Sequence, residues 1–166
     1  MTVHLVFMGV AGSGKTTAAR AVQELLGWDF AEGDDFHPPA NVAKMEAGFP
    51  LSDEDRIPWR ELLAAWTREQ ADAGRSTLIS CSALKRSYRD LLRTGGERTF
   101  FVHLVGDKGL LLQRMSAREH FMPPSLLESQ LDTLESLHDD EPGITVDVAE
   151  PAEAIARRVV AELGLG

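Results

Sequence analysis

Cysteine and long apolar runs are the two clearest shortages of this sequence. Cys81 is the one cysteine among 166 residues, which excludes an internal disulfide and a cysteine-rich metal cluster. No apolar run approaches the ~20 residues that span a bilayer, and the first residues lack the charged and apolar segments of a cleavable signal. We therefore expect a cytoplasmic protein with no membrane partner.

Positive charge is also scarce. The chain carries 17 Lys and Arg residues against 26 Asp and Glu residues, which gives a net charge of −9 at pH 7 and an isoelectric point near 5.0. No run of basic residues stands out, so the sequence disfavours nucleic acid as a partner and favours a small molecule. The length predicts one domain over residues 1–166, without an internal repeat or a linker.

What the sequence does contain is a glycine-rich segment near its start. Residues 9–16 fit the pattern G-x-x-x-x-G-K-S/T, an apolar strand precedes them, and an alanine-rich helix follows. Glycines let backbone N–H groups turn toward a polyphosphate, Lys15 reaches its outer phosphates, and the Thr16 hydroxyl binds Mg²⁺. A chance glycine turn is the alternative, but the flanking strand and helix favour phosphate binding. The residues expected to hold the phosphates are Gly9, Ala11, Gly12, Ser13, Gly14, Lys15, Thr16 and Thr17.

Five apolar strands alternate with helices along the chain. This order predicts an α/β fold, the three-layer P-loop NTPase sandwich, in which helices cover both faces of a five-stranded parallel sheet. Two helices inserted between about residues 38 and 74 would form a substrate flap, and residues of about 114–130 would form a lid. The expected strands are 3–8, 28–31, 76–82, 99–105 and 144–148, and the expected helices are 15–27, 41–47, 52–74, 83–89, 108–118, 125–137 and 151–163.

An acidic loop follows the second expected strand. It places Asp34 and His37 at the carboxyl end of that strand, which is where open parallel sheets bind their ligands. Each residue also has an ordinary explanation, since Asp34 could cap a turn and His37 could lie on the surface before a proline. Another histidine, His103, lies inside an apolar strand, and we interpret it as structural.

Two pairs of cations each lie four residues apart. Lys85 and Arg89 follow the third strand, where they could grip an anion, and Arg114 with Arg118 precedes a proline-containing loop. The second pair lies at the mouth of the expected lid, which suggests that it clamps a phosphate. Solvated charge on a helix surface is the alternative for both pairs.

Several motifs of other phosphate-loop proteins are missing. The chain has neither Asn-Lys-x-Asp, which reads guanine, nor the Leu-Ser-Gly-Gly-Gln run of transporter ATPases. The third strand also lacks the terminal Asp that commonly helps to hold the metal ion, so the sequence identifies no metal ligand besides Thr16. A flap and a lid that exclude water favour a small-molecule kinase. A nucleotide-binding switch without catalytic activity is the alternative from another class.

The motifs together resemble the gluconokinase family of small P-loop kinases. The resemblance covers nearly the whole chain, and it rests on blocks at 9–16, 32–38, 41–45, 48–59, 81–90 and 120–135. It implies ATP-dependent phosphorylation of D-gluconate at the 6-hydroxyl, Mg²⁺ as cofactor, an adenylate-kinase-like fold and a homodimer. A kinase for another small hydroxy acid, such as shikimate, is the nearest alternative.

The resemblance also implies a role for each candidate residue. Asp34 would contact the acceptor hydroxyl and could act as its base, and the segment after Val148 would hold the adenine. The run 137–141 departs from the family pattern because it adds acidic residues. The residues expected to hold the sugar acid are His37, Arg56, Lys85 and Arg89, and those expected to stabilise the transferring phosphoryl group are Lys15, Arg114 and Arg118.

Overall fold

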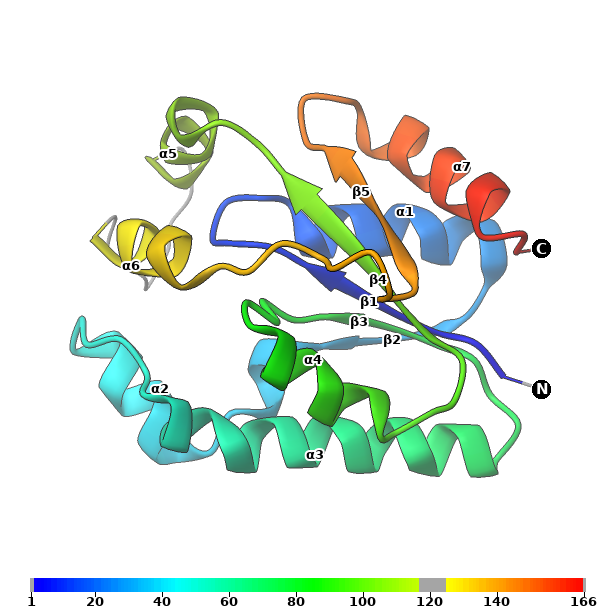
Figure 1. Ribbon diagram of the computed structural model, residues 1–166, viewed down its shortest axis with the longest axis horizontal. Helices are drawn as coiled ribbons and strands as arrows, with labels where there is room; N and C mark the ends of the chain where they lie inside the picture. The colour runs from blue at the N-terminus through cyan, green and yellow to red at the C-terminus, as the bar shows by residue number, and fades with distance from the viewer. Residues whose placement is uncertain (1, 117–124, 166) are drawn as a thin grey trace.

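The computed structural model describes residues 2–116 and 125–165. A five-stranded parallel sheet runs through its centre in the order β2-β3-β1-β4-β5 (Figure 1). The strands are β1 (His4–Met8), β2 (Asp29–Glu32), β3 (Thr77–Ser80), β4 (Thr99–Val105) and β5 (Gly143–Asp147). The prediction of a parallel α/β sheet is confirmed, and each strand lies within two residues of its expected bounds.

Helices cover both faces of the sheet. In Figure 1, α1 (Lys15–Leu26) and α7 (Ala152–Glu162) lie above the sheet, and α3 (Asp53–Asp72) and α4 (Arg86–Arg93) lie below it. The remaining helices gather beyond the carboxyl ends of the strands. They are the short η1 (Gly33–Phe36), α2 (Pro39–Glu46), α5 (Lys108–Ser116) and α6 (Ser125–Thr133).

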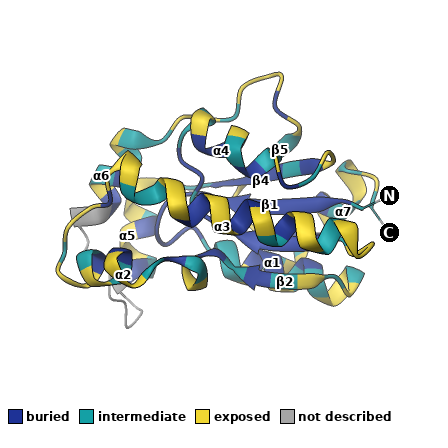
Figure 2. Ribbon diagram, turned by 90° about the horizontal axis from the view of Figure 1, so that it is seen from below, coloured by how far each residue is buried: buried dark blue, intermediate teal, exposed yellow. Residues whose placement is uncertain are grey.

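The alternation of side chains along β1 divides the core between the two faces. Leu5 and Phe7 pack into the cluster under α1 and α7, whereas Val6 and Met8 pack into the cluster under α3. All five residues of β1 are buried, as expected for a central strand with helices on both sides. Figure 2 shows that α3 buries only one side, since exposed and buried residues alternate along its length.

Helix α3 is part of the core and does not behave as a flap alone. Its Trp59 and Leu63 are at most 2% exposed and pack against the sheet. The helix begins at Ser52, whose hydroxyl accepts a hydrogen bond from the Asp55 amide while the Asp55 carboxylate accepts one from the Ser52 amide. Pro58 lies inside this helix, where its missing N–H removes the hydrogen bond that would go to the carbonyl oxygen of residue 54.

Two expected helices have other bounds than predicted. The helix expected over 83–89 begins only at Arg86, because Ala83 has a positive φ of 45° and Lys85 is extended. The helix expected over 125–137 ends at Thr133, and the chain beyond it runs irregularly to β5. Both differences lie beside the carboxyl end of the sheet, where loops replace regular structure.

Within the residues that the structure describes, no helix is long and apolar enough to cross a bilayer.

Candidate active site

The glycine-rich segment forms a tight loop between β1 and α1. Gly12 and Gly14 have positive φ angles of 80° and 84°, which residues with a side chain rarely adopt. A Cβ atom at Gly12 would also lie 2.9 Å from the Leu111 carbonyl oxygen. These two positions therefore require glycine for conformation and, at Gly12, for space.

The loop carries donors that the described part of the chain leaves without acceptors. In that part, the backbone amides of Gly12, Gly14, Thr16 and Thr17 make no hydrogen bond, and the buried Ser13 hydroxyl has no partner either. The Lys15 ammonium donates to the carbonyl oxygens of residues 9 and 10 at 3.1 and 3.2 Å. Orphaned donors at a helix start beside a cation fit a bound polyphosphate.

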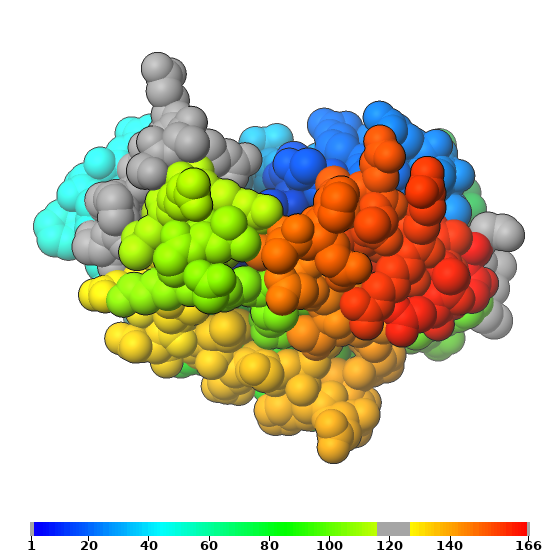
Figure 3. Space-filling model, turned by 90° about the horizontal axis from the view of Figure 1, so that it is seen from above, coloured from blue at the N-terminus to red at the C-terminus, as the bar shows by residue number. Residues whose placement is uncertain are grey.

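Two cavities meet at this loop. The first lies over the carboxyl ends of β2 and β3, and the second lies between α1, α5 and the segment after β5. Gly12 and Gly14 line both cavities, so the loop forms the wall between them. In the space-filling view, the blue N-terminal segment reaches the surface between the green α5 and the orange segment around β5 (Figure 3). A group bound on the loop could therefore pass from one cavity to the other.

Glu32 lies at the end of β2 in the first cavity. Its carboxylate accepts hydrogen bonds from the Thr16 hydroxyl at 2.6 Å and from the Ser80 hydroxyl. Within the described ranges, no group of three or more His, Cys, Asp or Glu side chains could hold a metal ion by itself. One hydroxyl and one carboxylate instead fit Mg²⁺, which completes its shell with phosphate oxygens and water.

Asp34 and His37 meet on the first cavity from η1 and the residue after it. His37 Nε2 lies 3.7 Å from Asp34 Oδ1, and the ring stacks on Trp59 with centroids 3.9 Å apart. Burial, with help from the Arg56 and Arg60 guanidinium groups, lowers the pKa of His37 to about 4. His37 is therefore neutral near pH 7, while Asp34 lies exposed at the cavity mouth.

One polar chain links Arg56, which lines this cavity, to Lys85, which is not among its lining residues. Arg56 lines the cavity and donates to the Tyr88 hydroxyl at 3.3 Å, and that hydroxyl donates to Asp53. Lys85 binds the same Asp53 carboxylate at 3.1 Å. Hydrogen bonds from Tyr88 and Lys85 lower the pKa of Asp53, so this carboxylate stays charged and holds both groups in place.

The sequence was compared with known proteins. No protein-family model matched it. A gluconokinase from Gluconobacter oxydans is 50% identical over 157 residues, which cover 94% of this chain and 88% of that protein. The chain belongs to the gluconokinase family.

Solved structures give the same family and fold. A gluconokinase from Sinorhizobium meliloti is 46% identical, with a TM-score of 0.85 over 98% of this chain and 91% of that one. A sugar kinase from Janibacter sp., solved without ligand, is 53% identical, with a TM-score of 0.96 over 100% of this chain and 96% of that one. The predicted P-loop kinase fold and kinase class are therefore confirmed.

The gluconokinase resemblance led us to expect Arg89 in the substrate site, and the geometry argues against it. Arg89 is 0% exposed, and its donors bind the Glu141 carboxylate and the carbonyl oxygens of residues 83, 135 and 136. Arg89 also does not share a helix face with Lys85, because Lys85 precedes α4 and reaches outward to Asp53. Arg89 instead fixes the turn at Ala83, next to the cavity residue Ser82.

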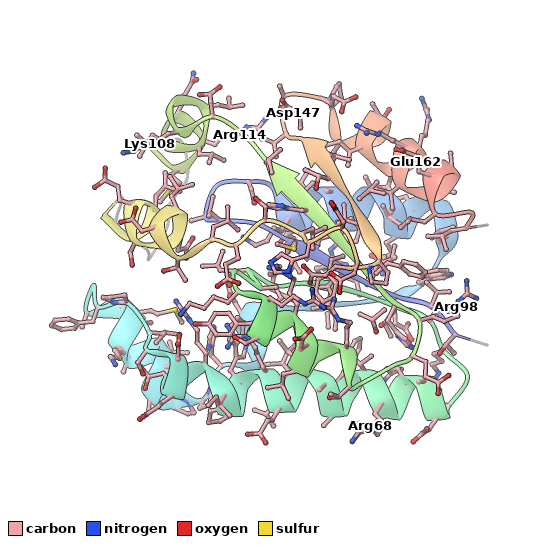
Figure 4. The ribbon with its side chains drawn as sticks, viewed as in Figure 1. Arg68, Arg98, Lys108, Arg114, Asp147 and Glu162 are labelled. Carbon is pink, nitrogen blue, oxygen red and sulfur yellow. The ribbon has the colours of Figure 1, made fainter. Side chains whose placement is uncertain are left out.

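Arg114 lies in the second cavity of this gluconokinase-family chain. Its guanidinium donates to the Val148 carbonyl oxygen at 2.8 Å, and Figure 4 shows the side chain between α5 and the end of β5. The segment expected to hold adenine, from Val148 to Pro151, lines the same cavity. Arg118 and residues 117–124 of the expected lid lie outside the described residues.

Sequence reasoning missed three residues of the site. Glu32 belongs to the block 32–38 without a predicted role, although its position at a strand end is a usable signal. Gln130 is 9% exposed, lines the first cavity, and accepts a hydrogen bond from the Ala11 amide at 2.7 Å. Asn41 contacts His37, as described below. No local pattern predicts the Gln130 contact, because the two residues lie 119 positions apart.

Proposed function

We propose that this chain transfers the γ-phosphoryl group of ATP to the 6-hydroxyl of D-gluconate, which gives 6-phospho-D-gluconate and ADP. The observation that carries this proposal is the pair of cavities that share Gly12 and Gly14. A nucleotide in the second cavity would lay its phosphates on the loop, and a sugar acid in the first cavity would meet the terminal phosphate there. Membership of the gluconokinase family supports gluconate as the acceptor.

The nucleotide side uses the loop and its neighbours. The phosphates would be held by the Ser13 hydroxyl and by the amides of Gly12, Gly14, Thr16 and Thr17, and Lys15 would leave its loop carbonyls for the outer phosphates. Gly9 and Ala11 shape the loop, since their amides already donate to Ser82 and Gln130. Arg114 would reach the transferring group from the second cavity, and Arg118 keeps its predicted role.

The Mg²⁺ site would be built on Thr16 and Glu32. The Thr16 hydroxyl is the direct ligand predicted from the sequence, and Glu32 would orient it or hold a metal-bound water. When bound, Mg²⁺ neutralises charge on the terminal phosphates during transfer. The fit rests on a carboxylate that already contacts this hydroxyl.

The acceptor side uses Asp34, His37 and the Arg56 chain. Arg56 would bind the carboxylate of gluconate, with Lys85 at the outer rim, and Asp34 and His37 would contact its hydroxyl groups. In the transfer step, a bond forms between O6 and the γ-phosphorus, and the bond from that phosphorus to the ADP oxygen breaks. Asp34 would accept the O6 proton. Positioning supplies most of the rate, because phosphoryl transfer needs little covalent help.

An acceptor panel tests the proposal. ADP release would be measured with ATP, Mg²⁺ and each of gluconate, shikimate, glycerate and a nucleoside monophosphate. We expect gluconate to give the highest kcat/KM, and we expect Lys15→Ala to abolish that turnover. A higher kcat/KM for shikimate would overturn the acceptor, and ADP release that ignores every acceptor would favour a nucleotide switch.

Two further expectations stay predictions from the sequence. The homodimer would be tested by sedimentation of the purified chain, and the cytoplasmic location by fractionation of cells that express it.

A further inference from the structure

We propose that Asn41 is a positioning residue that holds His37 in the neutral form with its proton on Nε2, so that His37 serves the acceptor site only as a hydrogen-bond donor. The proton assignment depends on the structure alone. Its consequence for the acceptor rests on the proposed function.

The orientation of the Asn41 amide follows from its second contact. Asn41 Nδ2 lies 2.9 Å from the backbone carbonyl oxygen of Asp55 and 3.2 Å from His37 Nδ1. A carbonyl oxygen only accepts hydrogen bonds, so the atom that faces it must be the amide nitrogen. If the amide were flipped, two oxygens would face each other at 2.9 Å. The nitrogen therefore has one N–H for Asp55 and one for His37.

The protonation of His37 follows from that donor. A ring nitrogen that accepts a hydrogen bond cannot carry a proton, so Nδ1 is bare and the proton of the neutral ring lies on Nε2. An imidazolium would place an N–H on Nδ1 against the Asn41 N–H. Asn41 and the His37 side chain are both about nine-tenths buried or more, which keeps water from substituting for this contact.

The charged groups around His37 agree with a neutral ring. Arg56 and Arg60 on α3 act against protonation, and burial acts in the same direction. Asp34 on η1 is an acid that opposes them, with Oδ1 at 3.7 Å from Nε2. On the ring face, Trp59 stacks on the imidazole and its indole N–H donates to the Gly33 carbonyl oxygen at 2.7 Å. Trp59 thus fixes the orientation of the imidazole ring, and Asn41 fixes which nitrogen carries the proton.

The consequence is a division of roles at the acceptor hydroxyl. The bare nitrogen of His37, Nδ1, faces the Asn41 amide and not the acceptor site, so His37 cannot act as the general base there. Its Nε2–H can donate to Asp34 or to an oxygen of the sugar acid. Asp34 is then the one proton acceptor of this pair.

Nitrogen-15 NMR of the whole chain without substrates tests the assignment at pH 7. The ring shifts of His37, assigned by their loss in His37→Gln, should show a bare Nδ1 and a protonated Nε2. Asn41→Asp would place a carboxylate beside Nδ1 and should move the proton to that nitrogen. His4, whose ring nitrogens contact Thr77 and Thr2, serves as the internal control and should not change. A protonated Nδ1 in the unmodified chain would overturn the proposal.

Kinetics with gluconate test the consequence. His37→Gln keeps a donor near the position of Nε2 and should retain kcat/KM within about tenfold, whereas His37→Leu should lose about a hundredfold or more. Equal losses in the two variants would refute the donor role. If neither the unmodified chain nor its variants phosphorylate gluconate, the proposed function fails, while the NMR result still decides the protonation of His37.

Discussion

The Arg89 guanidinium and the Glu141 carboxylate form a paired ion contact that solvent does not reach. Arg89 Nε lies 2.7 Å from Glu141 Oε1, Nη2 lies 3.0 Å from Oε2, and both side chains are 0% exposed. The pair fastens the irregular segment after α6 to α4 and to the turn at Ala83. The acidic run at 137–141, which departs from the family pattern, thus has a structural role.

Glu141→Gln should destabilise the fold by about 3 kcal/mol or more, because it leaves the Arg89 charge buried without an anion. Thermal or urea unfolding measures the loss. Asp140→Asn is the matched control, since Asp140 pairs with Arg86 at an exposed position and should cost less than about 1 kcal/mol. Equal losses in the two variants would contradict a special role for the buried pair.

His103 should make the fold sensitive to mild acid. Burial, with help from Arg89, lowers the pKa of His103 to about 4, and neither ring nitrogen has a hydrogen-bond partner among the described residues. Between pH 6.5 and 4 the unfolded chain binds more protons than the folded one, so the free energy of unfolding falls as the pH falls. His37 acts in the same direction.

His103→Leu tests this pH dependence. The difference in unfolding free energy between pH 7.5 and pH 5 should shrink by about 2 kcal/mol, which is about 1.5 pH units at 1.36 kcal/mol each. Comparison of each variant with itself at two pH values removes the effect of changed packing. An unchanged difference would mean that His103 titrates normally in the folded chain.

Asp34→Asn should lower kcat for gluconate by about 10²–10⁴ while the KM for ATP changes little, because the change removes the proton acceptor and leaves the phosphate loop intact. Steady-state kinetics measure both constants. Asp35→Asn makes the same charge change at the exposed neighbouring position and should leave kcat near that of the unmodified chain. A kcat unaffected by Asp34→Asn would reduce Asp34 to a turn residue.

Glu32→Gln should raise the Mg²⁺ concentration needed for half-maximal rate by about tenfold or more. The amide can still accept from the Thr16 hydroxyl, so the change tests the charge and not the hydrogen bond. Titration of the rate with MgCl₂ at fixed ATP measures the effect. Glu46→Gln on the exposed side of α2 is the control. The same Mg²⁺ dependence in both variants would exclude Glu32 from the metal site.

Local signals in the sequence predicted most of the fold. The apolar strands and the ends of the helices expected over 15–27 and 52–74 each depend on a few neighbouring residues, and they lie within two residues of the prediction. The start of α4 was wrong because Ala83 adopts a positive φ, which sequence patterns do not indicate for alanine. The contact from Arg89 to Glu141 holds that turn from 52 residues away.

The site was predicted unevenly for the same reason. The phosphate loop is contiguous, so its glycines, Lys15 and Thr16 were found together. The roles of Arg89 and Gln130 depend on burial and on distant partners, which the spacing of charges cannot reveal. Glu32 could have been found, because a carboxylate at the end of a strand beside the loop is a recognisable arrangement.

The central claim is that the loop between the two cavities delivers a phosphoryl group to the terminal hydroxyl of gluconate. NMR of the product formed from ATP and gluconate labelled with carbon-13 at C6 tests it most directly. We predict that the labelled carbon signal is split by coupling to phosphorus in the product of the unmodified chain, and that Lys15→Ala yields no such product. An unsplit C6 signal in a phosphorylated product, or a phosphorylated product that forms without Lys15, would contradict the claim.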